Sequence, residues 1–280
     1  MRVVRMWMIL ITLLLAHAVS FARAAEGEIH WYKDLNEAMA AAQQTNRPIM
    51  IDFWADWCGP CRIMDAEVYT DPALIAAFRE KMIAVRIHFD LQPKVVRQFD
   101  VPALPYLVFT DSHGTELLHH RGMLEAADIT AVIQAIPADL SEINRLDRTL
   151  QEDKNHFPSL RDMGQRLRDL GFYEASNRFF EQALRRDEAK KDAAQRETIL
   201  YSTALNSLAL RDGKAAASAL ERCLKEFPRS VRRPDALLAL GRAYLLQEDS
   251  NKARRSLNAV IAEFPQSSAA AQARELLQTL

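Results

Sequence analysis

Cysteine is scarce in this chain: only three of its 280 residues are cysteines, at positions 58, 61 and 223. A fold of this length is therefore not held together by a framework of disulfides, and its stability has to come from packed cores. Hydrophobic residues make up 49% of the sequence, which is ample for such cores. The length predicts two domains.

Long apolar runs are also missing, except for residues 6–15 near the start. Arg2 and Arg5 precede this run, and Ala22-Arg23-Ala24 follows it, which is the order of a secretory signal peptide. We therefore predict a signal peptide over residues 1–24 and export, most simply to a bacterial periplasm. The run is short for a transmembrane helix, and an uncleaved N-terminal membrane anchor is the alternative.

Charge of one sign does not dominate the whole chain, which has a formal net charge of −1. Residues 25–140 carry 17 acidic and nine basic side chains, a balance of −8, whereas residues 141–280 carry 20 acidic and 24 basic ones, a balance of +4. The change of sign supports a domain boundary near residue 140. A balance of +4 does not predict binding to nucleic acid.

Two of the cysteines lie in the stretch Asp52-Phe-Trp-Ala-Asp-Trp-Cys-Gly-Pro-Cys-Arg62. An apolar run predicts a buried strand before them, and helical spacing follows them, so they fall on a strand-to-helix turn. A thiolate at a helix N-terminus is stabilised by free amides and by the helix dipole. We predict that Cys58 is the acidic, exposed, attacking thiol and that Cys61, one turn along, is the buried resolving thiol.

The residues around the cysteines fit a site that binds a protein substrate. Gly59 lets a backbone pass closely, and Pro60 fits the first helical turn, where its missing N–H costs nothing. We expect Trp57 to shield the cysteine pair and to offer a flat apolar surface to the substrate.

Two other interpretations of the cysteine pair are weighed. Zinc needs four ligands, and no second Cys-x-x-Cys or paired histidine motif follows, so no metal and no cofactor is predicted. A structural disulfide without turnover suits an exported protein, but Trp57 and the Gly59-Pro60 dipeptide argue against it.

The stretch 52–62 resembles the active-site segment of the thioredoxin superfamily. In that family a buried aspartate, matched here by Asp52, helps to move the proton of the resolving cysteine; burial raises the pKa of a carboxyl group and makes it a base near neutral pH. Leu104-Pro105-Tyr106 matches the segment whose cis-proline faces the disulfide and whose preceding residue pairs with a substrate peptide. The resemblance therefore implies that Leu104 and Pro105 contact the substrate.

Three segments depart from the thioredoxin pattern. Arg86 stands on the strand where thioredoxins often carry a lysine near the buried aspartate, and arginine cannot shuttle a proton. Pro102-Ala103 replaces a basic residue and a glycine. Residues 64–72 are more similar to the thioredoxin-like domains of bacterial envelope disulfide reductases than to stand-alone thioredoxins.

Residues 141–280 show helical periodicity without a strand pattern. Ala175, Ala216 and Ala253 are separated by 41 and 37 residues, and apolar residues follow each of them at intervals of four. The series Leu240-Gly241-x-x-Tyr244, Ala253 and Pro265 resembles the tetratricopeptide signature. We thus expect an α/β thioredoxin-like fold over residues 25–140 and an all-α tetratricopeptide-type repeat domain over residues 141–280, whose groove holds a protein partner.

These features predict an exported thiol-disulfide oxidoreductase. The Gly-Pro dipeptide, shared with thioredoxins, favours a protein-disulfide reductase that takes electrons from a separate membrane donor and passes them to disulfide-bonded proteins. The alternatives are an envelope assembly or adaptor protein, in which the first domain mainly binds partners, and a net oxidase or isomerase.

Overall fold

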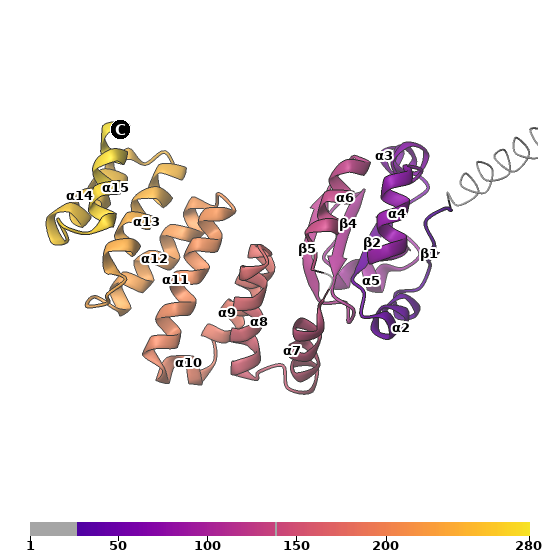
Figure 1. Cartoon of the computed structure of the whole chain (residues 1–280), viewed down its shortest axis with the longest axis horizontal. Helices are drawn as coiled ribbons and strands as arrows, with labels where there is room; N and C mark the ends of the chain where they lie inside the picture. The colour runs from indigo at the N-terminus through magenta and orange to yellow at the C-terminus, as the bar shows by residue number, and fades with distance from the viewer. Residues whose placement is uncertain (1–26, 138) are drawn as a thin grey trace, which may run out of the picture. The chain divides into compact units, whose positions relative to one another are not determined.

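The computed structural model describes residues 27–137 and 139–280 (Figure 1). The chain forms two compact units, and the boundary between them falls between Leu140 and Ser141. The predicted signal peptide, residues 1–24, lies outside the described residues. Among the described helices, none combines the length and the apolar character needed to cross a membrane.

The first unit is built on a five-stranded mixed sheet in the order β1-β3-β2-β4-β5. The central strand β2 pairs in parallel with β3 and antiparallel with β4, which agrees with the α/β thioredoxin-like fold expected for this unit. The strands are β1 (Trp31–Tyr32), β2 (Ile49–Trp54), β3 (Ile83–His88), β4 (Tyr106–Thr110) and β5 (Glu116–Arg121).

Three helices of the first unit, α2, α3 and α4, begin at a residue whose side chain caps them. Asp71 caps α4 by accepting hydrogen bonds from the backbone N–H groups of Ala73 and Leu74, each at 2.9 Å. Pro72 is the first residue of that helix, where its fixed φ fits and no N–H is needed. The helical segments are α2 (Leu35–Thr45), α3 (Gly59–Ile63), the π-helix η1 (Met64–Val68), α4 (Pro72–Lys81), α5 (Pro93–Gln98) and α6 (Ala126–Ala135).

The central strand β2 is buried on both faces, and its alternation separates two environments. Ile49, Ile51 and Phe53 pack in the core cluster that includes residues of α2. Asp52 and Trp54 point to the opposite face, because neighbouring side chains of a strand alternate. Asp52 therefore places a carboxyl group inside the protein, on the same face of β2 as Trp54, the last residue of that strand.

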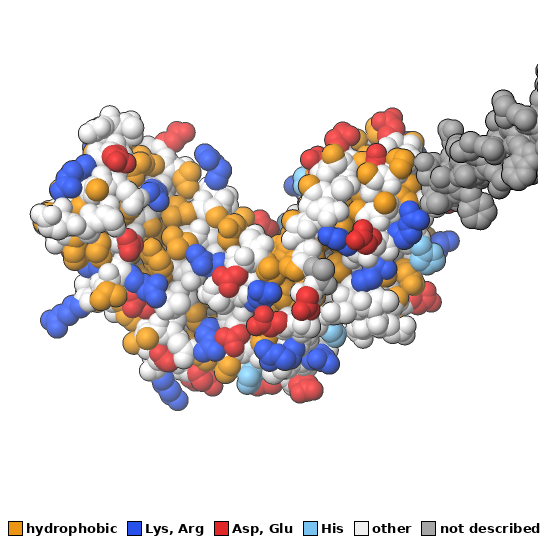
Figure 2. Space-filling model, viewed as in Figure 1, with side chains coloured by type: hydrophobic (Ala, Val, Ile, Leu, Met, Phe, Trp, Pro, Cys, Tyr) orange, Lys and Arg blue, Asp and Glu red, His pale blue; other side chains and the backbone are white. Residues whose placement is uncertain are grey.

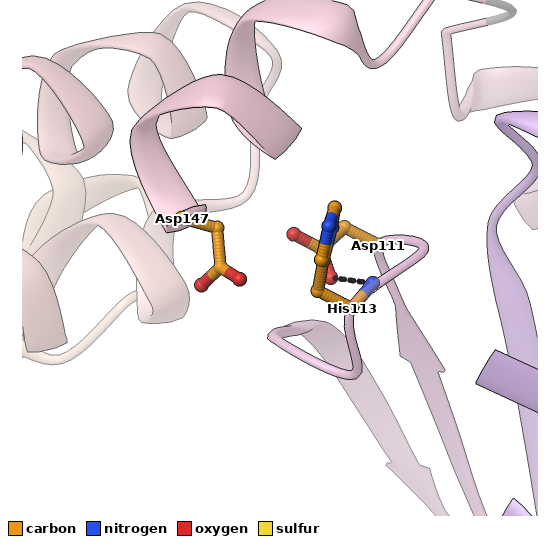
Figure 3. Close-up of side chains that lie close together, drawn as sticks. All are labelled: Asp111, His113 and Asp147. Carbon is orange, nitrogen blue, oxygen red and sulfur yellow. Dashed lines mark hydrogen bonds between the residues drawn. The ribbon is translucent and has the colours of Figure 1, made fainter. Parts of the chain in front are cut away.

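The turn between β4 and β5 is organised by a buried aspartate. Oδ1 of Asp111 accepts a hydrogen bond from the backbone N–H of His113 at 2.9 Å (Figure 3). It also accepts one from the backbone N–H of Thr115 at 2.9 Å. Gly114 has a φ of +88°, a conformation that glycine adopts without strain. This turn connects the two antiparallel strands of the β4–β5 hairpin.

The second unit is entirely helical in its described residues. Helices pair in sequence, α8 with α9, α11 with α12, and α13 with α14, and each pair agrees with one predicted repeat. The segments are α7 (Ser141–Glu152), α8 (Phe157–Asp169), α9 (Tyr173–Leu184), α10 (Asp187–Lys191), α11 (Ala193–Ala209), α12 (Gly213–Glu226), α13 (Arg233–Leu246), α14 (Ser250–Glu263) and α15 (Ser268–Gln278).

The last two repeats use the same contacts at equivalent positions. Arg196 pairs with Glu226, and 37 residues later Arg233 pairs with Glu263, in each case through both carboxylate oxygens. Inside the last pair, a Cβ added to Gly241 would lie 2.6 Å from a side-chain carbon of Leu257. Glycine therefore lets α13 and α14 approach closely, which explains its place in the repeat signature.

Candidate redox site

The cysteine pair lies where β2 gives way to α3, as predicted. Cys58 is the N-cap of α3, and its Sγ accepts a hydrogen bond from the backbone N–H of Cys61 at 3.2 Å. Cys58 and Cys61 form a disulfide, with their Cα atoms 5.3 Å apart. One helical turn thus holds both sulfur atoms together at the start of the helix.

The prediction that Cys58 is exposed is wrong for the disulfide form of the protein. Cys58 is 3% exposed and Cys61 is 2% exposed. Both sulfurs pack with Ala55, and a second layer covers them, consisting of Trp54, Phe89 and Leu104. The sequence pattern placed Cys58 at a helix start, and the resemblance placed the Leu104-Pro105 segment at the disulfide, but neither indicated that Trp54 and Phe89 also cover the sulfurs.

Trp57 lies at the surface beside this cluster. It is 62% exposed, its Nε1 donates a hydrogen bond to Asp90 at 2.8 Å, and its ring meets the edge of Phe89. The apolar covering of the cysteines is made by Trp54, Phe89 and Leu104, while Trp57 presents its flat surface to solvent. Leu91, next to Asp90, is 77% exposed and adds to the apolar surface.

The other residues predicted to contact substrate lie around the pair. Pro60 falls in the first turn of α3, where it was expected. Gly59 faces open space, since no heavy atom lies within 4 Å of a Cβ added there, so no close passage within the described chain requires glycine. The Leu104–Pro105 peptide bond is cis, as the resemblance implies, and Leu104 packs against the cysteine cluster.

Asp52 is the buried carboxyl group of the site. It is 2% exposed, and burial raises its pKa to about 6, with a further upward contribution from the charge of Asp65. The positive charge of Arg86 lowers the pKa in part. A carboxyl group with this pKa exchanges a proton near neutral pH, as expected of a base.

Arg86 stands directly opposite Asp52 in the parallel pairing of β2 and β3. Its Nε lies 3.1 Å from Oδ2 of Asp52, and its Nη2 lies 2.8 Å from Oδ1 of Asp65. The position at which the sequence departs from thioredoxin is therefore in direct contact with the predicted base.

Three aromatic rings surround the Arg86 guanidinium, and the sequence did not identify them as part of the site. The guanidinium carbon lies 4.6 Å from the ring centroid of Trp54, 5.2 Å from that of Trp31 and 5.8 Å from that of Tyr69. Strand alternation puts Trp54 on the same face as Asp52 and could have indicated its role. Tyr69 offers no such signal, because it follows a π-helical turn that shifts the usual helical spacing.

The helical unit carries an apolar groove lined by side chains of α11 and α13. It has a volume of about 500 Å³, and its lining residues are Leu205, Leu208, Ala209, Arg242, Leu245 and Leu246. Figure 2 shows hydrophobic side chains gathered over this part of the unit, with basic and acidic side chains interspersed around them.

Comparison with known families agrees with both architectures. Residues 30–112 match the thioredoxin-like family model, and residues 207–277 match the tetratricopeptide repeat model. The chain therefore combines a thioredoxin-like domain, which carries the Cys58–Cys61 pair, with a tetratricopeptide-type helical region.

Individual relatives share the first domain. Thioredoxin 1 of Chlorobaculum tepidum is 39% identical over 61 residues, which are 22% of this chain and 57% of the relative. Thiol:disulfide interchange protein DsbD of Vibrio vulnificus is 28% identical over 109 residues, 37% of this chain and 18% of DsbD. The solved structure of DsbH oxidoreductase aligns with 40% of this chain and 86% of its own, at 21% identity and a TM-score of 0.36. The chain thus spans less than two thirds of the length of these two sequence relatives.

Proposed function

We propose that this protein is an exported, periplasmic protein-disulfide reductase. The observation that carries the proposal is the Cys58–Cys61 pair, bonded across the first turn of α3 within a Cys-Gly-Pro-Cys motif. In its reduced form, the Cys58 thiolate attacks a substrate disulfide and forms a mixed disulfide, releasing one substrate thiol. Cys61 then attacks Cys58 Sγ, which releases the second substrate thiol and restores the disulfide of the protein.

The surrounding residues have distinct roles in this reaction. Asp52 accepts the proton that Cys61 loses when it attacks, since its raised pKa suits proton transfer near neutral pH. Trp57, Gly59 and Pro60 contact the substrate beside the sulfurs. Leu104 pairs with the extended backbone of the substrate, and Pro105 contacts the substrate at the same place. A membrane protein supplies the two electrons that reduce the disulfide again.

The direction of electron flow is tested by the reduction potential of the Cys58/Cys61 couple, measured by equilibration with thiol-disulfide buffers. We expect a value near about −270 mV, that of thioredoxin, because the Gly-Pro dipeptide is shared. A value near about −180 or −120 mV, typical of protein disulfide isomerase and DsbA, would instead assign an isomerase or an oxidase.

The tetratricopeptide region favours a second candidate, an envelope adaptor whose first domain mainly binds partners. Its groove is about 500 Å³ and mostly apolar, which suits a protein segment. Replacing Cys61 with serine separates the two functions, because a mixed disulfide on Cys58 is then not resolved. We expect the C61S variant to accumulate substrate proteins in bonds that a reductant breaks, as seen on non-reducing gels.

The matched control for this trapping experiment is the double variant C58S/C61S. If the protein is a reductase, the double variant traps no substrate proteins, because it lacks the Cys58 thiol that forms the mixed disulfide. Equal recovery of the same partners with both variants would favour the adaptor.

A further inference from the structure

The predicted base Asp52 belongs to a cluster of ionisable side chains that three other residues complete. Arg86 comes from β3, Asp65 from η1, and Tyr69 from the position that ends η1. On the remaining side, the residue of β4 paired with Asp52 is Leu107, which cannot ionise. One arginine therefore faces two carboxylates and a phenol, and its positive charge favours the ionised form of Asp52 against the larger effect of burial.

Arg86 is built into this position more firmly than an ordinary surface arginine. Its two ends contact different carboxylates, Asp52 through Nε and Asp65 through Nη2, at 3.1 and 2.8 Å. This fork requires a guanidinium, because a lysine ammonium is a point charge on a flexible stem. Arginine also keeps its proton at every pH of interest, so the charge it supplies is constant.

The aromatic cage, defined as Trp31, Trp54 and Tyr69, restricts the other movements of the guanidinium. Its three ring centroids lie within 5.8 Å of the guanidinium carbon, close enough for cation–π attraction. The π-helical turn contributes to the cage, since the backbone N–H of Tyr69 bonds to the carbonyl of Met64 five residues back, at 2.9 Å. That wider turn carries both Asp65 and Tyr69, which meet Arg86 from one side.

We infer that Arg86 is a positioning residue for the proposed disulfide exchange: fixed by the aromatic cage between Asp52 and Asp65, it keeps Asp52 in the ionised form that accepts the proton of Cys61. The inference rests on the proposed function. The effect assigned to Arg86 agrees with the electrostatics of the cluster, because Arg86 lowers the pKa of Asp52, whereas burial and Asp65 raise it. Loss of Arg86 therefore raises the pKa of Asp52, and loss of the Asp65 charge lowers it.

The test compares R86Q and D65N by the pH dependence of insulin-disulfide reduction and by NMR titration of the Asp52 carboxyl carbon in the oxidised protein. We expect R86Q to shift the acid limb and the Asp52 titration upward by about one pH unit. The ionised fraction of Asp52 at pH 6, and with it the rate, should then fall about fivefold and recover above pH 8. D65N should shift the acid limb and the Asp52 titration to lower pH. R86K, which keeps the charge but not the fork, should lie between R86Q and wild type.

The matched control is R97Q, which removes an exposed arginine of the same unit on α5 and should leave both curves unchanged. Circular dichroism checks that each variant is folded, and D65N changes a partly exposed side chain, so it tests the inference even if R86Q unfolds. Asp52 titrations that coincide in wild type, D65N and R86Q would overturn the inference. Failure of the proposed function would give a different result, because the wild-type protein would then show no Cys58-dependent reduction of insulin. The NMR titration of Asp52 would still report the effect of Arg86 in that case.

Discussion

Replacing Cys58 with serine should abolish insulin-disulfide reduction, lowering the rate by at least about a thousandfold. Disulfide exchange needs a sulfur anion, and a serine hydroxyl neither ionises near neutral pH nor forms a disulfide. The measurement is the rate of insulin reduction with dithiothreitol as the electron source, corrected for the rate without protein.

The chain provides its own control for this prediction. Cys223 is a buried residue of α12, and burial raises the pKa of its thiol to about 11, so it is not a nucleophile at neutral pH. C223S should therefore keep the wild-type rate. Equal rates in C58S and wild type would end the claim that the first domain is an enzyme.

Replacing Asp52 with asparagine should slow reduction about a hundredfold at pH 7, the lower end of what a positioned base contributes. Asparagine fits the same space but cannot take the proton of Cys61. The loss should be largest above pH 6, the pH near which Asp52 ionises, and smaller below it, where Asp52 is itself protonated. Rates of wild type and D52N measured between pH 5 and 9 check this dependence.

The stability of D52N distinguishes a loss of catalysis in this variant from damage to its fold. The pKa of Asp52 is raised from 3.8 to about 6, so the folded protein holds the proton more tightly than the unfolded chain does. The stability that this group contributes is complete below about pH 4 and is lost as the pH rises through 6. D52N escapes that loss, and Arg86 keeps its contact with Asp65, so we expect D52N to be more stable at pH 7.5 by about 1–3 kcal/mol.

Urea unfolding at pH 4 and at pH 7.5 measures this difference, which should nearly vanish at the lower pH. A D52N protein that loses activity and stability together would show that Asp52 is a structural residue. Retention of the wild-type rate would remove Asp52 from the mechanism.

Much of the architecture could be predicted because local patterns carry it. The strand before Cys58 and the cap at Asp71 depend on side-chain alternation and on short-range hydrogen bonds. The helical repeats reveal themselves by recurrence, which needs no knowledge of tertiary contacts. The π-helical turn at Met64–Val68 was not predicted, because its residues also fit an ordinary helix.

The sequence by itself determined the chemistry available to this protein: a thiol pair one helical turn apart, a carboxyl group on the preceding strand, and two domains of different fold. Only the tertiary structure decided the surroundings of that chemistry. Cys58 is buried because Phe89 and Leu104 reach it from distant segments, and Arg86 is fixed because Trp31 and Tyr69 close around it. Burial and electrostatics depend on every group that surrounds a side chain in space, and residues far apart in the sequence supply most of those groups.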